Sequence, residues 1–407
     1  MQKFEKHSPV VVTEVTTKHE LRQFMQYPNR LYADNPNYIP SFYGDDLSDW
    51  TPGKNPAFDY CEARCWLAWR DGEIGGRIGA LLSHTANDKF GTHRMRFSQV
   101  DFVDDSEVSA ALFGMVERWA REKGCDQVHG PLGFTDMDRE GMLVEGFDRR
   151  SLFFTNYNAP DSLEHLTRLG YRKDVDWIEY RITVPAPGSA EAERLHKLSE
   201  FILKRKNLHV ATVHHKSEYG PFVRQVFELV NAAYAPLYGV VELSDEQIER
   251  YANKFIPLVD PDFVCFVLDE QDTLVAFGVT ALDPSVALKH SDGRLFPFGW
   301  AGVLNDLHHS DTLIMLLTAV RPDLQTEGIN AVMMDHVCQS CNRHGVQFAE
   351  TGPMLELNDH ILAQWKRLEK EQHKRRRCFI KDLNHDVNAA NTAAAAQAEA
   401  PETAPAA

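Results

Sequence analysis

The sequence predicts an α+β fold of the α/β class, built from two tandem units with mostly antiparallel, mixed sheets. Two observations lead to this prediction. The chain matches itself when it is offset by about 200 residues, and the matching segments place helices and short apolar runs in the same order. Apolar runs that are joined by a polar turn predict antiparallel hairpins, and apolar residues at i, i+3, i+4 predict amphipathic helices. The repeated order therefore indicates a tandem duplication.

The first matching element is a helix that a hairpin follows. In the first half, "ARCWLAW" (63–69) turns at Asp71-Gly72 into "EIGGRIGALL" (73–82), and in the second half "DFVCFVL" (262–268) precedes "TLVAFGVTAL" (273–282). The helical residues that recur at a constant offset of 202 are Arg22, Gln23, Asn29 and Tyr32, which become Arg224, Gln225, Asn231 and Tyr234.

A second helix recurs at an offset of 221 and follows the same helical spacing in both halves. A Gly-Pro pair comes next in each half (130–131 and 352–353), and the strands "WIEYRI" and "CFIKDL" close the two halves. We therefore predict a first unit at 1–185, a linker at 186–193, a second unit at 194–383 and a disordered Ala-rich tail at 384–407. The paired helical residues are Val108, Ala111, Leu112, Val116 and Ala120 with Ile329, Val332, Met333, Val337 and Cys341.

Composition narrows the class of protein. The 407 residues are 43% hydrophobic and carry a formal charge of −16, which argues against a nucleic-acid partner, because nucleic-acid affinity comes from neutralising phosphates. No transmembrane run or signal peptide is expected, and seven irregularly spaced cysteines fit a cytoplasmic protein. Cys338, Cys341 and His344 share helical spacing and lack a second ligand pair, so we expect buried thiols and no metal.

The two halves differ before the second helix. The first half passes from the acidic run 101–105 directly into its helix, whereas the second half has three more residues, Leu324-Gln325-Thr326, and then Gly328. Backbone N–H groups at such a glycine-containing strand-to-helix junction favour anions. Carboxylates at a helix N-terminus repel them. A phosphate group is therefore expected in the second half alone.

This order of elements resembles the GNAT acyl-CoA N-acyltransferase fold, whose pyrophosphate loop reads Q/R-x-x-G-x-G/A. The stretch 325–330, "QTEGIN", is similar, with Asn330 in place of the final small residue. The resemblance implies that acyl-CoA, or an acyl carrier protein, is a co-substrate and that no cofactor is permanently bound. It also implies that backbone near Thr318 to Val320, opposite Glu350, binds the thioester oxygen. The residues expected to bind the cofactor are Thr318, Val320, Gln325, Thr326, Glu327, Gly328, Ile329, Asn330 and Ala331.

The chain to about residue 383 also resembles a narrower family of tandem-GNAT proteins, the YghO-like and bacterial-ceramide-synthase-like group. The resembling blocks are "YADNPNYIPSF", "KNPAF", "GPLGFTDMDREGMLVEGFD" and "LGYRKDVDWIEYRI". The resemblance implies transfer of a fatty acyl group to the amine of a sphingoid-type base. It does not identify catalytic residues.

The segment 136–148 has five carboxylates, one arginine and two glycines, which predict a loop. It is either a solvated acidic loop or a loop that attracts a cationic amine acceptor. In the second interpretation Asp138 and Glu145 take part in catalysis. The expected substrate-binding residues are Asp136, Arg139, Glu140, Met142 and Phe147.

Further catalytic candidates lie near the Gly-Pro pairs. Glu350 follows a strand, Asn358 precedes a helix that it could simply cap, and Tyr157 is either a core aromatic or a hydroxyl that faces the cleft. The basic run "HKRRR" (373–377) is either a solvated approach to the last strand, a CoA-steering charge or a contact with an anionic inner membrane.

The expected function is therefore acyl-CoA-dependent N-acyl transfer to a long-chain amino alcohol or a related amine. The second half would bind acyl-CoA and the first half would bind the amine. Two alternatives stay open: a non-catalytic acyl-CoA or acyl-carrier binding protein, and a peptidoglycan-type aminoacyl transferase on the same doubled fold.

Overall fold

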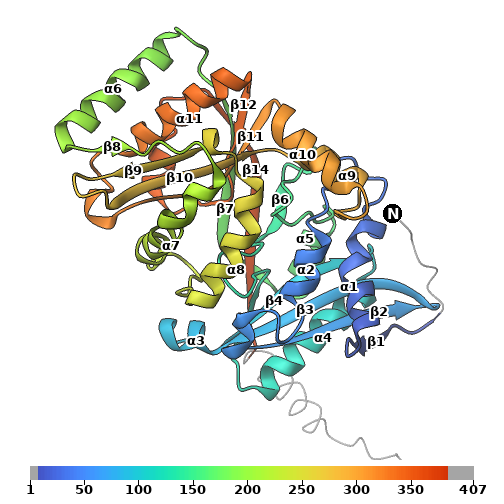
Figure 1. Ribbon diagram of the computed structural model, residues 1–407. Coiled ribbons are helices and arrows are strands. Elements are labelled where there is room, and N and C mark those ends of the chain that lie inside the picture. The colour runs from blue at the N-terminus through green and yellow to red at the C-terminus, as the bar shows by residue number, and fades with distance from the viewer. Residues whose placement is uncertain (1–7, 384–407) are drawn as a thin grey trace, which may run out of the picture.

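The computed structural model describes residues 8–383, so the predicted tail at 384–407 lies outside the described residues (Figure 1). Its strands form one 14-stranded sheet that runs through both halves of the chain. The pairings are antiparallel except for two, β4–β5 and β11–β12, one in each half. The predicted mixed, mostly antiparallel α+β fold is confirmed.

The first half supplies one end of the sheet, with the order β1-β2-β3-β4-β5. Helices α1 and α2 pack on one face of these strands and α4 packs on the other. The elements are β1 (Val11–Glu14), α1 (Lys18–Leu31), α2 (Tyr43–Asp49), β2 (Cys61–Arg70), β3 (Glu73–Ser83), α3 (His84–Phe90), β4 (Arg94–Phe102), α4 (Ser106–Glu122), β5 (Gln127–Gly130), β6 (Met142–Glu145), α5 (Ser162–Arg168) and β7 (Arg172–Thr183).

The second half supplies the other end, with the order β12-β11-β10-β9-β8. Helices α6 and α11 pack on one face, and α7 to α10 pack on the other. The elements are α6 (Ala190–Lys206), β8 (His209–Val210), α7 (Gly220–Tyr234), α8 (Asp245–Phe255), β9 (Val264–Leu268), β10 (Leu274–Leu282), α9 (Ser285–His290), α10 (Gly299–His309), β11 (Thr312–Val320), α11 (Asn330–His344), β12 (Phe348–Glu350), β13 (Met354–Leu355), α12 (Asp359–Ala363) and β14 (Lys370–Asp382).

The last strand of each half lies beside strands of the other half. Strand β14 pairs with β5, and β7 pairs with β12, so the order at the seam is β5-β14-β7-β12. The long β7–β14 ladder joins the two halves in the centre of Figure 1. The boundaries 1–185 and 194–383 stay a prediction about the repeat in the sequence, whereas in space the halves interlock. Helix α6 begins at Ala190, inside the predicted linker.

The basic run 373–377 lies within β14 and not on an exposed approach to it. Lys374 and Arg376 are 1% and 0% exposed and pair with Glu179 of β7, and His373 is also buried. The run is basic because it neutralises buried carboxylates across the seam. It therefore does not form the surface for CoA steering or membrane contact that its charge had suggested.

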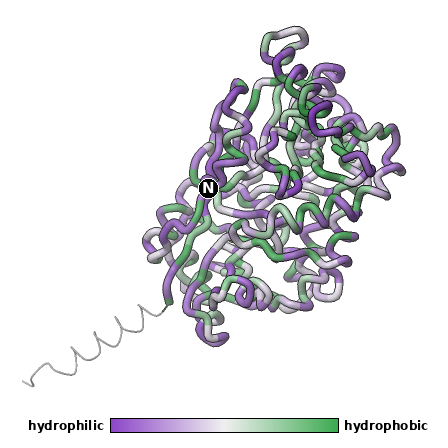
Figure 2. The backbone as a smooth tube through the Cα atoms, turned by 90° about the vertical axis from the view of Figure 1, so that its left-hand side faces the viewer, coloured by the Kyte–Doolittle hydropathy of each residue, from purple (hydrophilic) through white to green (hydrophobic). Residues whose placement is uncertain are grey.

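The core follows the sheet. Figure 2 shows hydrophilic stretches along the outer turns of the chain, around interior segments that are largely hydrophobic. Among the described residues, no helix is both long and apolar enough to cross a membrane.

Candidate active site

The glycine loop lies between β11 and α11. Gly328 has φ +80°, a conformation that favours glycine, and Ile329 at the N-cap of α11 makes no side-chain cap. The helix N-terminus therefore presents backbone N–H groups that no side-chain cap satisfies, which suits an anion. Gln325, Thr326 and Gly328 are exposed, whereas Ile329 and Ala331 are buried, and the Ala331 N–H already donates to the Gly328 carbonyl at 2.9 Å.

Helix α6 brings positive charge to this loop. Its last turn contains Lys204, Arg205 and Lys206, and Lys206 Nζ lies 2.6 Å from Glu327. Ile202 of the same helix lies beside the loop, because a Cβ added at Gly328 would lie 3.1 Å from its Cδ1. The described residues of the first half, which begin at Ser8, contain no counterpart of this helix, and its role at the loop could not be read from the sequence.

The equivalent helix N-terminus in the first half is already occupied. Asp105 caps α4 by accepting from the backbone N–H groups of Glu107 and Val108. The buried Arg70 pairs with both Asp105 and Glu107. These carboxylates occupy the place where an anion would bind, as the sequence predicted.

An apolar cavity of about 740 Å³, counting its open mouth, lies between α11 and the strands β11, β12 and β7. Two predicted residues line it: Thr318, and Asn330 at the start of α11. Val320 lies in the core beside α6 and α11 instead. Other lining residues are Leu195, Met315, Met333, Met334, Val337, Cys338, Cys341 and Trp365.

The equivalent space in the first half is filled by aromatic rings. The parallel ladders end at Arg96–His129 in the first half and at Ile314–Glu350 in the second, so the next residues along β4 and β11 are Phe97 and Met315. The ring of Phe97 packs 5.2 Å from Phe113 and 5.7 Å from Tyr171. Among the described residues of the first half, carboxylates thus occupy the helix N-terminus and aromatic rings fill the space beneath it.

Strands β11 and β12 separate after the Ile314–Glu350 pair, whereas β11 continues along β10 with an irregularity between Met315 and Leu317. Glu350 therefore pairs with Ile314, four residues before Thr318. The prediction that Glu350 lies opposite Thr318 to Val320 is wrong. Its carboxylate lies 3.2 Å from Lys374 Nζ and 3.9 Å from His373 Nε2. Burial raises the pKa of Glu350, and the Lys374 ammonium opposes this shift.

A second, polar pocket of about 610 Å³ lies between the halves. Residues of α2, the loop after β5 and the end of α8 line it, and four carboxylates face two cations there. Arg139 pairs with Asp46 at 2.7 Å, and Lys254 lies 3.3 Å from Asp49. The charged lining residues are Asp45, Asp46, Asp49, Asp138, Arg139 and Lys254.

Asp138 differs from the other carboxylates in this pocket. It accepts hydrogen bonds from the backbone N–H groups of Phe134 and Thr135 and from the Tyr251 hydroxyl of the second half. Burial, together with the nearby charge of Asp49, raises the pKa of Asp138 to about 6. The predicted acidic loop therefore does reach the second half.

The polar pocket and the apolar cavity approach each other at the end of β12. A Cβ added at Gly352 would lie 3.4 Å from the backbone oxygen of Met315, which lines the cavity, and 3.6 Å from the ring of Phe154, which lines the pocket. One layer of residues thus separates the two spaces at Gly352, two residues beyond Glu350, whose side chain lines neither of them.

Several other candidates lie elsewhere. Glu145 is an exposed residue at the end of β6 and lies 3.2 Å from Arg375, so the structure does not bring it to Asp138. Tyr157 packs with Tyr32 and Tyr38, and Asn358 caps α12.

The rest of the acidic loop is largely buried. Met142 packs in the core beneath α4, and Phe147 packs against the tyrosine cluster, so neither lines the polar pocket. Asp136 and Glu140 are partly buried, and burial raises the pKa of each carboxyl. Of this loop, Asp138 and Arg139 are the predicted residues that line the pocket.

The sequence did not predict four charged pocket residues, Asp45, Asp46, Asp49 and Lys254. The three aspartates follow the block "YADNPNYIPSF", whose resemblance assigns no residue roles, and Lys254 lies on α8. No regular spacing connects the four, because a tertiary contact between the halves brings them together.

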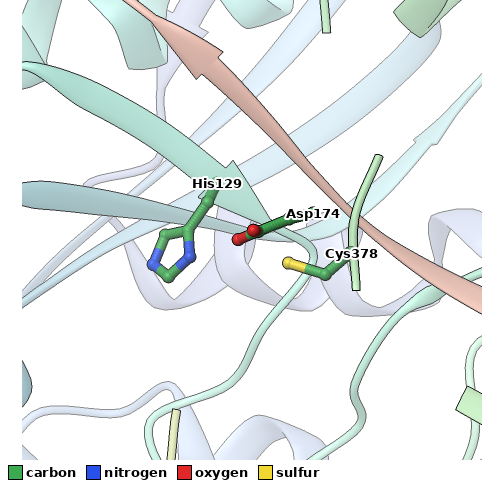
Figure 3. Close-up of side chains that lie close together, drawn as sticks. All are labelled: His129, Asp174 and Cys378. Atoms are coloured by element: carbon green, nitrogen blue, oxygen red, sulfur yellow. The ribbon is translucent and has the colours of Figure 1, made fainter. Parts of the chain in front are cut away.

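One cluster of side chains with metal-ligating atoms lies near the seam (Figure 3). It consists of His129, Asp174 and Cys378. The Tyr238 hydroxyl lies among them, 2.9 Å from His129 Nδ1, 2.5 Å from Asp174 and 3.5 Å from Cys378 Sγ. Burial and the charge of Arg96 hold the pKa of His129 well below its usual range. Hydrogen bonding to one hydroxyl therefore accounts for the cluster without an ion.

Comparisons with known proteins agree with this architecture. The chain is 27% identical to protein YghO of Escherichia coli (strain K12) over 383 residues, which cover 92% of this chain and 95% of that protein. It is 28% identical to the bacterial ceramide synthase of Caulobacter vibrioides over 299 residues, which cover 72% and 75%. The chain matches no protein-family model.

Among solved structures, a tandem GNAT protein from the clavulanic acid biosynthesis pathway superposes with a TM-score of 0.51, covering 92% of this chain and 98% of that chain at 12% identity. The chain therefore has the tandem GNAT fold. Its resemblance to YghO and to bacterial ceramide synthase, expected from the sequence, is confirmed. These similarities support an acyl-CoA-dependent N-acyltransferase.

Proposed function

We propose that this tandem GNAT protein transfers a fatty acyl group from acyl-CoA to the amine of a long-chain amino alcohol or a related lipid precursor. One observation carries the proposal: an apolar cavity that begins at a glycine loop approaches an acidic pocket at the end of β12. Similarity to the bacterial ceramide synthase supports the choice of acceptor.

The donor binds in the second half. The pyrophosphate lies at residues 325–331 against the N-terminus of α11, and the basic last turn of α6 adds favourable charge. The pantetheine and acyl chain enter the cavity beneath α11. The methionines that line it adapt readily to a flexible apolar chain.

The acceptor binds in the polar pocket between the halves. An ammonium headgroup is attracted by Asp138, the carboxylate there that hydrogen bonds hold instead of a cation. Asp46 already pairs with Arg139, and Asp49 already pairs with Lys254 and Arg250. Phe153 and Phe154 line the same pocket and suit the apolar part of an amphiphile.

The chemistry is amide formation from a thioester. The amine loses a proton to Glu350, either directly or through water, and its nitrogen attacks the thioester carbonyl. Backbone N–H groups near the irregular part of β11 stabilise the oxyanion. The C–S bond then breaks, the nitrogen loses its second proton to give the amide, and the departing coenzyme A thiolate takes up that proton. The raised pKa of Glu350 makes its carboxylate a better base than an exposed one.

Incubation with radiolabelled palmitoyl-CoA and a sphingoid-type amine tests the proposal, with the lipid products separated by chromatography. A labelled N-acyl product is the expected result. Binding of palmitoyl-CoA without a product from any amine would favour a non-catalytic binding protein. Activity that requires aminoacyl-tRNA would favour the peptidoglycan-type alternative.

A further inference from the structure

The connection between β10 and β11 exposes large hydrophobic side chains. In the first half the equivalent connection contains α3 alone, whereas in the second half it contains α9, a loop and α10. Phe296 and Phe298 in this loop are 83% and 80% exposed, and Trp300 at the start of α10 is 48% exposed. We call the exposed set the hydrophobic tip, and its members are Val286, Phe296, Phe298, Trp300 and Leu304.

We propose that the hydrophobic tip binds the surface of a lipid bilayer with anionic headgroups. Aromatic side chains with a polar group, such as tryptophan, favour the boundary between headgroups and acyl chains, and phenylalanine and leucine enter the apolar side of that boundary. The tip combines both kinds of residue on one short segment.

The shape of the tip favours a bilayer over a protein partner. Phe296 and Phe298 flank Pro297 and project from a loop, each with more than three-quarters of its surface exposed. A stable protein interface usually needs a complementary patch of about 800 Å² on each partner. Projecting rings on a single loop suit a soft medium that closes around them.

The segment carries no net formal charge, unlike the chain as a whole. Within 285–309 the two cations, Lys289 and Arg294, balance the two carboxylates, Asp292 and Asp306, whereas the whole chain carries −16. Anionic headgroups therefore repel this segment less than the chain as a whole.

The base of the tip lies beside the polar pocket. The backbone N–H of Tyr43 donates to the carbonyl of Gly293 at 3.0 Å, and Ser41, which a Cβ at Gly293 would contact, lines that pocket. An amphiphilic amine that leaves the bilayer at the tip would therefore meet the acidic pocket. This delivery step rests on the proposed function, whereas binding to the bilayer does not.

Co-sedimentation of the full chain with vesicles tests the proposal. The vesicles contain phosphatidylglycerol and phosphatidylethanolamine, or phosphatidylcholine alone. The test variant is Phe296→Ser with Phe298→Ser. The control is Phe201→Ser, which alters an exposed phenylalanine on α6, away from the tip in Figure 1.

We expect the wild type and Phe201→Ser to bind the anionic vesicles and the double variant to bind at least about fivefold more weakly, with an unchanged circular dichroism spectrum. Equal binding by the double variant, or no binding by the wild type, would overturn the proposal. The proposal would also be overturned if light scattering showed that the wild type is a dimer and the double variant is a monomer. The tip would then join two copies of the chain.

A second readout separates this proposal from the proposed function. With a short water-soluble amine the double variant should retain wild-type turnover, and with a vesicle-embedded amine its turnover should fall. If no amine is acylated by either protein, the proposed function fails while the vesicle result still decides the bilayer proposal.

Discussion

The two halves of this chain have the same fold, but the residues at two equivalent places differ. At the N-terminus of the helix after the fourth strand, the first half has Asp105 with its Arg70 partner and the second half has Gly328. Beneath that helix, the first half has the ring of Phe97 and the second half has Met315 beside a cavity. On the proposed function, the first half has lost its cofactor site because side chains fill it, while the sheet and the helix remain.

The largest expected effect tests the helix N-terminus. Gly328→Asp adds a side chain at φ +80°, 3.1 Å from Ile202, and a negative charge where the pyrophosphate would lie. We expect the acyl-CoA dissociation constant to rise at least about tenfold, which corresponds to about 1.4 kcal/mol. Isothermal titration calorimetry measures it.

Gly345→Asp is the matched control for this substitution. Gly345 ends the same helix, also has a positive φ of +71°, and has open space around it. It should leave acyl-CoA affinity unchanged. An unaltered dissociation constant in Gly328→Asp would show that the loop is an ordinary helix start, and the contrast between the halves would lose its functional meaning.

The next prediction transfers the filling residue of the first half to the second. Met315→Phe places a ring where Phe97 stands in the first half, so the cavity should shorten. We expect the affinity for long-chain acyl-CoA to fall about fivefold to tenfold, with a smaller loss for acetyl-CoA, because less apolar surface is buried. Competition binding with a series of acyl chain lengths measures this.

The reciprocal change, Phe97→Met, sharpens the comparison. It removes a ring from a packed aromatic cluster, so it should lower the free energy of unfolding by about 1–3 kcal/mol without altering acyl-CoA affinity. Equal losses for acetyl and long acyl chains in Met315→Phe would mean that the cavity does not hold the acyl chain.

The sequence predicted the fold well because the fold depends on periodicity, and each half repeats the periodicity of the other. It predicted the glycine loop for a related reason: the Gly328 position needs a residue that tolerates positive φ, and that need is visible in the residue type. Local chemistry was also readable at Asn358, whose capping role was one of the two interpretations.

The rest of the candidate site depends on contacts between distant segments. Asp138 lines a pocket with Asp49 and Lys254. Glu145, seven residues later, lies at the end of β6 and pairs with Arg375 of β14. The basic run 373–377 was misread because the exchange of β7 and β14 buries it, and an isolated repeat gives no sign of this exchange. Pairing across the seam determined both outcomes.

A third prediction concerns the acceptor side. Asp138→Asn removes a charge from the polar pocket and keeps the size of the side chain, so the KM for the amine should rise about fivefold while acyl-CoA affinity stays the same. Glu145→Gln is the control, because Glu145 is exposed and does not line the pocket. If Glu145→Gln has the larger effect on the amine, the pocket is assigned wrongly.

The pH dependence of the KM for the amine should test the acceptor pocket separately from the acyl-CoA site. Because burial raises the pKa of Asp138 to about 6, its carboxyl becomes neutral as the pH falls through that value and attracts the ammonium less. The KM for the amine should therefore rise below about pH 6, and this rise should disappear in Asp138→Asn. Initial rates between pH 5 and 8, at saturating acyl-CoA, measure it.

The smallest expected effect concerns α6, which has no counterpart among the described residues of the first half. Lys206→Gln removes one cation beside the glycine loop but also frees the Glu327 carboxylate, whose pKa is lowered by its bond to Lys206. The freed Glu327 carboxylate would repel a bound pyrophosphate. Solvent screens the charges of Lys206 and Glu327, so the effect on acyl-CoA affinity should be small. We therefore expect acyl-CoA affinity to fall about twofold to threefold at low salt and the difference to vanish near 1 M salt, where the Debye length is about 3 Å.

Lys197→Gln, on the same helix but paired with Glu193, is the control and should change nothing. A salt-independent loss in Lys206→Gln would instead mean that α6 acts by packing Ile202 against the loop, and that the second half needs this helix for shape and not for charge.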